Sequence, residues 1–150
     1  MIRLGDQLQA HRVLDLRSHS RDAVLLELVE ATGLGPEVGD KEKLLEALID
    51  RERIESTAIA EGIAVPHAKI PSMSEFIIAY GRSRTGIAWT QRVESLPVHH
   101  VFLIAGPTDR QHRYLQFLAA VTMEIRRGEL RNALDAAQDA RKLLQVFRDT

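Results

Sequence analysis

Apolar residues recur at helical spacing through two stretches of the first third of the chain. Ser20 stands where an N-cap residue belongs, and the apolar positions that follow end at Gly33. Asp40 opens a second such stretch, which is expected to end near residues 51–52. The segment 34–40 between them contains a proline and two glycines and is predicted to be a loop. The two predicted apolar faces comprise Val24, Leu25, Leu28, Val29, Leu44, Leu45, Leu48 and Ile49.

Helical spacing returns in the last third of the chain. A helix is expected from Asp109 onward, and Gly128 is expected to end it. Residues 129–137 and 139–147 are predicted to form two closing helices. The apolar face of the first of these three helices comprises Tyr114, Phe117, Leu118, Val121 and Ile125.

The middle of the chain has a strand-like pattern instead. Residues 13–16 alternate apolar and polar, residues 76–80 and 86–89 are short apolar runs, and 98–105 is the strongest strand candidate. Residues 53–74 carry no helical stripe and are expected to form short strands and ordered loops. Because regular strand–helix alternation is absent there, we expect an α/β fold with a mixed sheet, in a single domain spanning residues 1–150.

Composition narrows the class of protein. The 20 lysines and arginines nearly balance 21 aspartates and glutamates, which favours neither nucleic-acid binding nor adsorption to an anionic membrane. The chain has no cysteine, so disulfides, thiolate metal sites and a cysteine nucleophile are excluded. No signal-peptide pattern and no apolar run near the roughly 18 residues of a membrane span are present. We therefore expect a cytoplasmic protein without direct membrane insertion.

His67 has an unusual setting within the sequence GIAVPHAK. Pro66 fixes its own φ angle and biases Val65 towards an extended conformation, so the pair forms a stiff platform for the His67 ring. Such a platform suits a nucleophile or ligand, and it equally suits a turn histidine that caps local carbonyl groups. Of the other histidines, His11 and His19 are expected at the surface. The neighbours His99 and His100 should point to opposite faces of a strand, one exposed and the other packed or hydrogen-bonded.

Three kinds of chemistry are open to His67. A zinc site with His112 and a distant carboxylate lacks a recognisable ligand motif, and a triad of Ser56, His67 and Asp109 lacks the GxSxG elbow. Phosphoryl transfer fits better, because a neutral imidazole nitrogen can attack phosphorus at neutral pH. No P-loop is present, so a nucleotide is not the expected donor. Residues that could hold the phosphoryl oxygens are Arg51, Ser56, Thr57, Lys69 and backbone amides of the glycine-containing loop.

The segment RERIESTAIAEGIAVPHAK resembles the active-site segment of the enzyme IIA components of the bacterial phosphoenolpyruvate-dependent phosphotransferase system. The similarity is to the fructose/mannitol type, and most to its nitrogen-regulatory branch. It implies a mixed, roughly five-stranded sheet flanked by helices. The matching positions are Arg51, Glu52, Ser56, Thr57, Ile59, Gly62, Ile63, Ala64, Val65, Pro66, His67, Ala68 and Lys69, with His112 downstream in DRQHRYLQFL.

The resemblance also implies roles for four residues. His67 would be the phosphorylated residue, and His112 a second active-site histidine that faces it. Arg51 would lie near the phosphoryl group, and Thr57 would supply a hydroxyl close to it. No metal ion or organic cofactor would be needed.

Partners follow from the resemblance as well. An HPr-like phosphohistidine protein would be the donor, and an apolar rim of Ile59, Ile63 and Ile70 would contact it. The favoured function is a nitrogen-regulatory phosphocarrier that acts on proteins such as potassium transporters or sensor kinases. One alternative is a fructose- or mannitol-specific IIA that passes the phosphoryl group to a IIB component for sugar transport. The other is a regulatory binding module that is never phosphorylated.

Four residues depart from the family pattern. Glu55 stands where glycine is common, and Glu61 where a neutral residue such as asparagine is frequent. Both add negative charge beside a site that would receive a dianion, so donor choice or rate could differ. Trp89 stands where phenylalanine or another apolar residue is usual, a change that a core could absorb, and Gly106 replaces a common alanine.

Overall fold

The computed structural model describes residues 2–33, 37–59, 61–92 and 96–150. The first half of the chain forms α1 (Leu4–Gln7), the 3-10 helix η1 (Ala10–Arg12), β1 (Val13–Asp15), α2 (Arg21–Thr32), α3 (Lys41–Ile54), β2 (Ala58–Ile59), β3 (Ile63–Ala64) and β4 (His67–Lys69). The second half forms β5 (Ile77–Ile87), β6 (Val98–Gly106), α4 (Gln111–Ile125), α5 (Gly128–Ala136) and α6 (Ala140–Arg148).

The strands form one mixed sheet, which confirms the predicted fold class. Its order is β1-β5-β6-β3-β2, with β4 also paired to β6, so the described residues give six strands against the roughly five expected. β5 and β6 run antiparallel, whereas β1 joins β5, and both β3 and β4 join β6, in parallel. β6 is therefore the strand that supports the short strands around His67.

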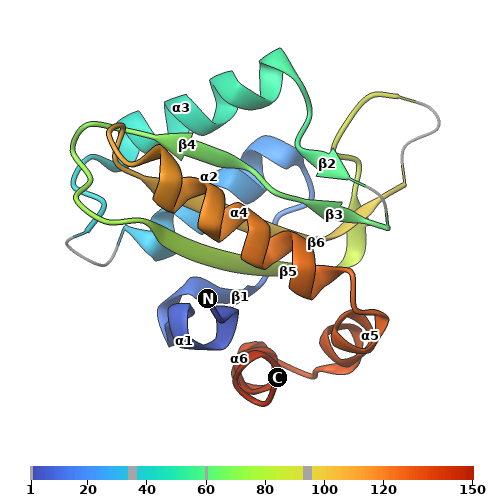
Figure 1. The fold of residues 1–150 in the computed structure, drawn as a ribbon. Coiled ribbons are helices and arrows are strands. Elements are labelled where there is room, and N and C mark those ends of the chain that lie inside the picture. The colour runs from blue at the N-terminus through green and yellow to red at the C-terminus, as the bar shows by residue number, and fades with distance from the viewer. Residues whose placement is uncertain (1, 34–36, 60, 93–95) are drawn as a thin grey trace.

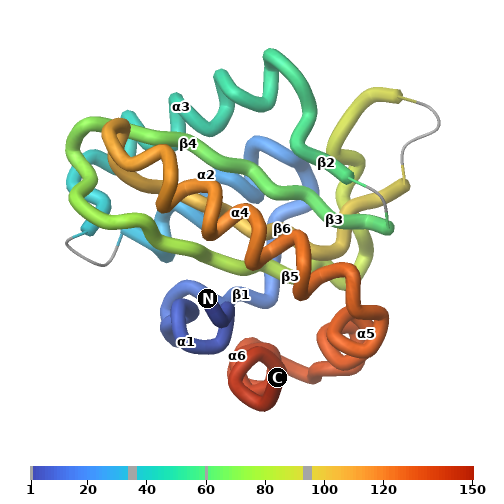
Figure 2. The backbone as a smooth tube through the Cα atoms, in the orientation of Figure 1, coloured from blue at the N-terminus to red at the C-terminus, as the bar shows by residue number. Residues whose placement is uncertain are grey.

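Helices cover both faces of the sheet (Figures 1 and 2). α2 and α3 lie on one face, while α1, α4, α5 and α6 lie on the other. The alternation along β6 shows why both faces are apolar. Phe102 and Ile104 pack in the core under α4, and Val101, Leu103 and Ala105 pack in the core under α2 and α3.

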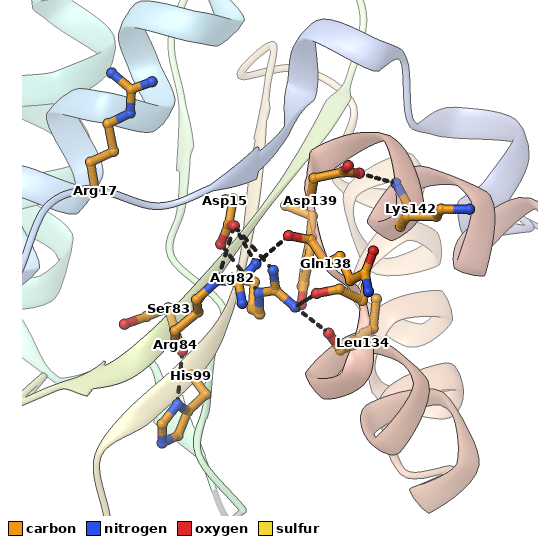
Figure 3. Close-up of polar contacts among 12 residues, drawn as sticks. Asp15, Arg17, Arg82, Ser83, Arg84, His99, Leu134, Gln138, Asp139 and Lys142 are labelled. Atoms are coloured by element: carbon orange, nitrogen blue, oxygen red, sulfur yellow. Dashed lines mark hydrogen bonds and ion pairs between the residues drawn. The ribbon is translucent and has the colours of Figure 1, made fainter.

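Three predicted helix starts are confirmed by their capping bonds. Ser20 Oγ accepts from Ala23 N at 3.3 Å, and Asp40 Oδ1 accepts from Lys43 N at 3.1 Å. Asp139 Oδ1 accepts from Lys142 N at 2.9 Å (Figure 3). These bonds satisfy amide groups that the first turn of a helix leaves without a partner.

Some boundaries differ from the sequence-based expectation. Residues 76–80 and 86–89 were expected to form two strands, but residues 77–80 and 86–87 belong to a single strand, β5, which runs through a register shift between Arg82 and Ile87. Gly86 has φ +87, which allows the strand to bend there and resume pairing at Ile87 with Val98. α1 and η1 were not predicted. Part of the predicted loop, residues 34–36, lies outside the described residues.

A buried arginine fixes α5 against the sheet (Figure 3). The Arg82 side chain is 2% exposed, and it pairs with Asp15 of β1 at 3.1 Å. It also donates to the carbonyl oxygens of Leu134, at 2.7 Å, and Ala137. These bonds hold the end of α5 over β5, and α5 in turn carries one wall of the site described below.

No helix in the described part of the chain is long and apolar enough to cross a membrane.

Candidate active site

The stiff segment before His67 is built into the sheet. Ala64 pairs with Val101 and His67 pairs with Ile104, so β3 and β4 keep one common register along β6. The ladder is interrupted between them because Pro66 has no N–H to donate. The Pro66 carbonyl still accepts from Ile104 N at 3.0 Å. His67 therefore begins β4 on a backbone that the central strand holds.

The His67 ring is fixed from two sides. Its Nδ1 lies 2.9 Å from the carbonyl oxygen of Val65, and its ring centroid lies 5.3 Å from that of Tyr114 in α4. Because a carbonyl oxygen only accepts hydrogen bonds, Nδ1 carries the proton in the neutral ring and Nε2 keeps its lone pair. The capping of a local carbonyl, an alternative that the sequence left open, is thus present and leaves the other nitrogen available.

Burial lowers the pKa of His67 below its ordinary value of 6.5, and the Arg51 guanidinium acts in the same direction. The Val65 carbonyl opposes this shift because it favours the protonated ring. The net effect is a neutral imidazole at neutral pH. Such a ring is in the nucleophilic form.

A chain of hydrogen bonds supports Val65 from behind. The buried Glu52 carboxylate accepts from the Thr57 amide at 3.0 Å, from the Thr57 hydroxyl, and from Trp89 Nε1 at 3.1 Å. The Thr57 carbonyl accepts from Val65 N at 3.1 Å. Trp89, which was expected only to fill the core, therefore also binds the carboxylate that positions the strand before His67.

His67 lies in the wall of a cleft of about 600 Å³. Arg51 and His67 also line a second, smaller hollow with Lys69 and Tyr114. Arg51 Nη1 donates to the Glu55 carbonyl at 2.7 Å, which orients its guanidinium beside the cleft. The cleft is lined by Arg51, Glu55, Ser56, Thr57, Ile59, Glu61, Ile63, Val65, His67, Leu118, Thr122, Ile125, Arg126 and Arg131.

The structure brings His67, Arg51 and Thr57 together in this cleft, but it places His112 elsewhere. His112 is exposed in the first turn of α4 and lines neither hollow that reaches His67. Tyr114, two positions later on the helix, makes the ring contact instead. Residues two apart on a helix point in nearly opposite directions, which explains the difference.

The other suggested phosphate-binding side chains have local partners. Lys69 Nζ donates to Gln111 Oε1 and lies 4.9 Å from the centre of the Tyr114 ring. Ser56 lines the cleft, and its Oγ accepts from Ala58 N at 3.1 Å. Asp109 lies in an exposed turn and does not line the cleft, so the geometry gives no support to a serine triad.

The predicted apolar rim is wrong at two of its three positions. Ile63 and Ile70 are 2% and 4% exposed, because both pack inside the fold. Ile59 is 48% exposed and lines the cleft, so it alone of the three can contact a partner.

The charges that the family pattern does not explain have specific places. Both glutamates line the cleft. The Glu61 carboxylate pairs with Arg131 Nη2 of α5 at 2.6 Å, whereas Glu55 contacts Arg51 through its backbone carbonyl. Sequence reasoning missed Arg126 and Arg131 as cleft residues. The basic residues around Gly128, where the predicted helix ends, were a signal, but their position depends on how α5 turns back.

Two further outcomes concern packing. A Cβ on Gly106 would lie 2.1 Å from Phe76 Cδ1, so glycine allows the Phe76 ring to pack beside Tyr114.

His100 is buried between Tyr80 Oη at 2.7 Å and Asp135 Oδ1 at 3.0 Å, whereas the less buried His99 binds the Ser83 carbonyl. The two histidines thus face opposite sides, although both are hydrogen-bonded. The described residues contain no cluster of three or more histidines, aspartates or glutamates suited to a metal ion.

The chain matches one known protein family over nearly its whole length. Residues 9–150 match the family model described as phosphoenolpyruvate-dependent sugar phosphotransferase system, EIIA 2. The chain is 30% identical over 147 residues to the fructose-specific EIIABC component of Bacillus subtilis, a match that covers 97% of this chain and 23% of that longer protein. It is 28% identical over 133 residues to a nitrogen regulatory protein of Bradyrhizobium diazoefficiens, covering 88% and 85% of the two chains.

Solved structures show the same fold. The nitrogen regulatory protein IIA-Ntr of Neisseria meningitidis superposes with a TM-score of 0.82 at 21% identity, covering 96% of this chain and 98% of that one. The enzyme IIA in the Escherichia coli complex of IIAMtl with phosphorylated IIBMtl gives a TM-score of 0.78 at 16% identity, covering 95% and 98%. The match across residues 9–150 is decisive, and the chain belongs to the EIIA 2 family of the phosphoenolpyruvate-dependent sugar phosphotransferase system.

Proposed function

We propose that this chain, as a single domain of residues 1–150, is a phosphocarrier whose phosphoryl acceptor is Nε2 of His67. The observation that carries the proposal is the bond from His67 Nδ1 to the Val65 carbonyl. It leaves the lone pair of Nε2 free in a ring whose pKa lies below its ordinary value. A neutral, fixed imidazole beside an arginine-lined cleft has the requirements for accepting a phosphoryl group from a protein donor.

The transfer itself balances without any cofactor. The Nε2 lone pair of His67 forms a bond to phosphorus, while the bond between phosphorus and the donor's histidine nitrogen breaks and its electron pair returns to that ring. The donor is an HPr-like phosphohistidine protein. Arg51, fixed by the Glu55 carbonyl, stabilises the charge on the equatorial oxygens.

Thr57 and His112 have different parts in this proposal. The Thr57 hydroxyl is bound to Glu52, so Thr57 acts as a positioning residue that holds Val65 and, through it, His67. His112 is exposed beside the start of α4. It would assist the phosphoryl group only after a change of rotamer when the donor or the phosphoryl group is bound.

The phosphorylated chain then acts in the cytoplasm as a regulator. Phosphorylation adds negative charge beside the exposed Ile59, so proteins that bind this surface would distinguish the two states. Regulated partners would be proteins such as potassium transporters or sensor kinases, in line with the relatives called nitrogen regulatory proteins. The alternative is transfer to a IIB component in sugar uptake, which the similarity to a fructose-specific EIIABC component favours.

The test is intact-mass spectrometry after incubation with phosphoenolpyruvate, enzyme I and an HPr-like donor. We expect a gain of one acid-labile phosphoryl group in the wild type, and none in His67→Gln. His99→Gln is a matched control, because that histidine is also on the sheet and bonds a backbone carbonyl, and it should be phosphorylated normally. A wild-type chain that gains no mass beside a phosphorylated control protein would leave only the binding-module alternative. Adding candidate IIB proteins to the phosphorylated chain separates onward transfer from retention.

A further inference from the structure

The cleft also contains cations that the proposed phosphorylation of His67 does not use. Arg126 and Arg131 line the same cleft as His67 and Arg51, but they come from the end of α4 and from α5. Three arginines and two glutamates line the cleft in all. The cleft thus contains two positive side chains, Arg126 and Arg131, in addition to Arg51 beside His67.

Arg131 is held ready to bind an anion. Its side chain is 19% exposed, and its Nη1 donates to the Ile125 carbonyl. Its Nη2 lies 2.6 Å from Glu61 Oε2, whose own side chain is 59% exposed. A largely buried guanidinium requires a partner, and here the partner is a carboxylate on the surface that can move away.

Glu61, which pairs with Arg131, has an unfavourable backbone conformation. Its φ of 70 lies in the left-handed region, which residues other than glycine and asparagine rarely adopt. The contact that the structure shows for its side chain is the ion pair with Arg131. Strain of this kind concentrates at functional positions.

Arg126 adds a second, free cation. It is exposed, and its side chain makes no hydrogen bond or ion pair with the residues that the structure describes, whereas its backbone N–H donates to the Glu124 carbonyl at the end of α4. The same cleft is lined by the apolar residues Leu118, Ile125 and Ile63. A volume of about 600 Å³ lies within the range of small-molecule sites and exceeds what one phosphoryl group requires.

We propose that Arg126 and Arg131 form an anion subsite for the phosphate group of a small phosphorylated metabolite, and that the Glu61 carboxylate occupies this subsite when the metabolite is absent. A phosphate monoester dianion carries more charge than the carboxylate it replaces, and guanidinium forks bind it with two parallel hydrogen bonds. The rest of the molecule would lie over Leu118 and Ile125. Binding here does not depend on phosphorylation of His67.

Calorimetric titration with glycerol 3-phosphate and with inorganic phosphate tests this subsite, with glycerol as the uncharged control. Glu61→Gln removes the competing carboxylate and should bind glycerol 3-phosphate about tenfold more tightly than the wild type, a difference of about 1.4 kcal/mol. Glu61→Asn, which suits the left-handed backbone, should behave in the same way and guards against misfolding of the first variant. Glycerol should give no heat.

The site is located by variants made in the Glu61→Gln background. Arg131→Gln and Arg126→Gln should each weaken binding several-fold, while the matched control Arg127→Gln, which removes the same charge just outside the cleft, should not. The proposal is overturned if neither Glu61 variant binds more tightly than the wild type, or if Arg127→Gln weakens binding as much as the cleft variants. It is also overturned if binding is lost in Arg51→Gln but kept in Arg131→Gln, because the anion would then lie beside His67. His67→Gln should still bind glycerol 3-phosphate, which would show that the subsite does not depend on the phosphocarrier function.

Discussion

Trp89 Nε1 donates to Glu52 Oε2 across 3.1 Å, and this bond joins the segment that follows β5 to the last turns of α3. Both side chains are almost completely buried. The same carboxylate accepts from the amide and the hydroxyl of Thr57. The Thr57 carbonyl accepts from Val65 N, and the Val65 carbonyl in turn binds His67 Nδ1. The only tryptophan of the chain is therefore four hydrogen-bonded steps from the proposed phosphoryl acceptor.

Replacement of Trp89 by phenylalanine should keep the packing and lose the bond to Glu52. We expect the free energy of unfolding to fall by about 2 kcal/mol, because a buried hydrogen bond to a charged acceptor is removed. Urea denaturation followed by circular dichroism measures the change. An unaltered midpoint and slope would show that the indole bond contributes nothing to stability.

Replacement of Glu52 by glutamine should be more harmful. The neutral amide binds Trp89 and Thr57 less strongly than the carboxylate does, and its –NH2 has a partner only if the Thr57 hydroxyl turns to accept. We therefore expect a loss of about 3 kcal/mol in the free energy of unfolding. Phosphorylation of His67 should also slow about tenfold, since Val65 is no longer held firmly. Glu46→Gln, exposed on the same helix, is the matched control and should change neither quantity. If the stability falls but the rate of phosphorylation does not, Glu52 has no positioning role.

The titration of His67 has a defined direction. Burial and Arg51 lower its pKa, so its NMR midpoint should lie below 6.5. The ring should therefore be neutral at pH 7, and phosphorylation should be lost only as the pH falls through this lowered pKa. Arg51→Gln should move the midpoint upward, while Arg53→Gln, exposed near the end of the same helix, should leave it unchanged. A wild-type midpoint at or above 6.5 would contradict this electrostatic description.

Asp15 should make the protein sensitive to acid. Burial alone would raise its pKa, but bonds to Arg82 and Arg84 outweigh this and leave the pKa below the ordinary 3.8. Its contribution to stability is therefore complete above the unfolded-state pKa and is lost as the pH falls through the folded-state pKa. Asp15→Asn should be less stable at pH 7 and should lose less stability on acidification than the wild type. Asp50→Asn, at an exposed ion pair, serves as the control, and equal acid sensitivity of wild type and Asp15→Asn would refute the assignment.

Local signals in the sequence were sufficient for much of the fold. Ser20, Asp40 and Asp139 cap their helices through contacts with residues three positions away, which a sequence window contains. α1 was missed because four residues carry too little periodicity, and its burial depends on contact with α6. The continuity of β5 was also missed, since it depends on pairing with β6 rather than on its own sequence.

The site was predictable only in part, for the same reason. The segment around His67 carries its own signature, and the structure does place Arg51, Thr57 and His67 together. The burial of Ile63 was not visible, because a strand of two residues shows no alternation until the sheet covers both faces. Arg131 reaches the cleft only because the buried Arg82 fixes α5 against the sheet, and that contact joins residues more than 50 positions apart.

Nitrogen-specific NMR of the phosphorylated chain tests the central claim most directly. The protein, labelled with ¹⁵N in its histidine rings, would be phosphorylated by the HPr-like donor and its phosphorus–nitrogen coupling measured. The account predicts one phosphohistidine, with phosphorus bonded to Nε2 of His67 and a proton retained on Nδ1 opposite the Val65 carbonyl. A bond to Nδ1 of His67, or a phosphoryl group on any other histidine, would contradict it.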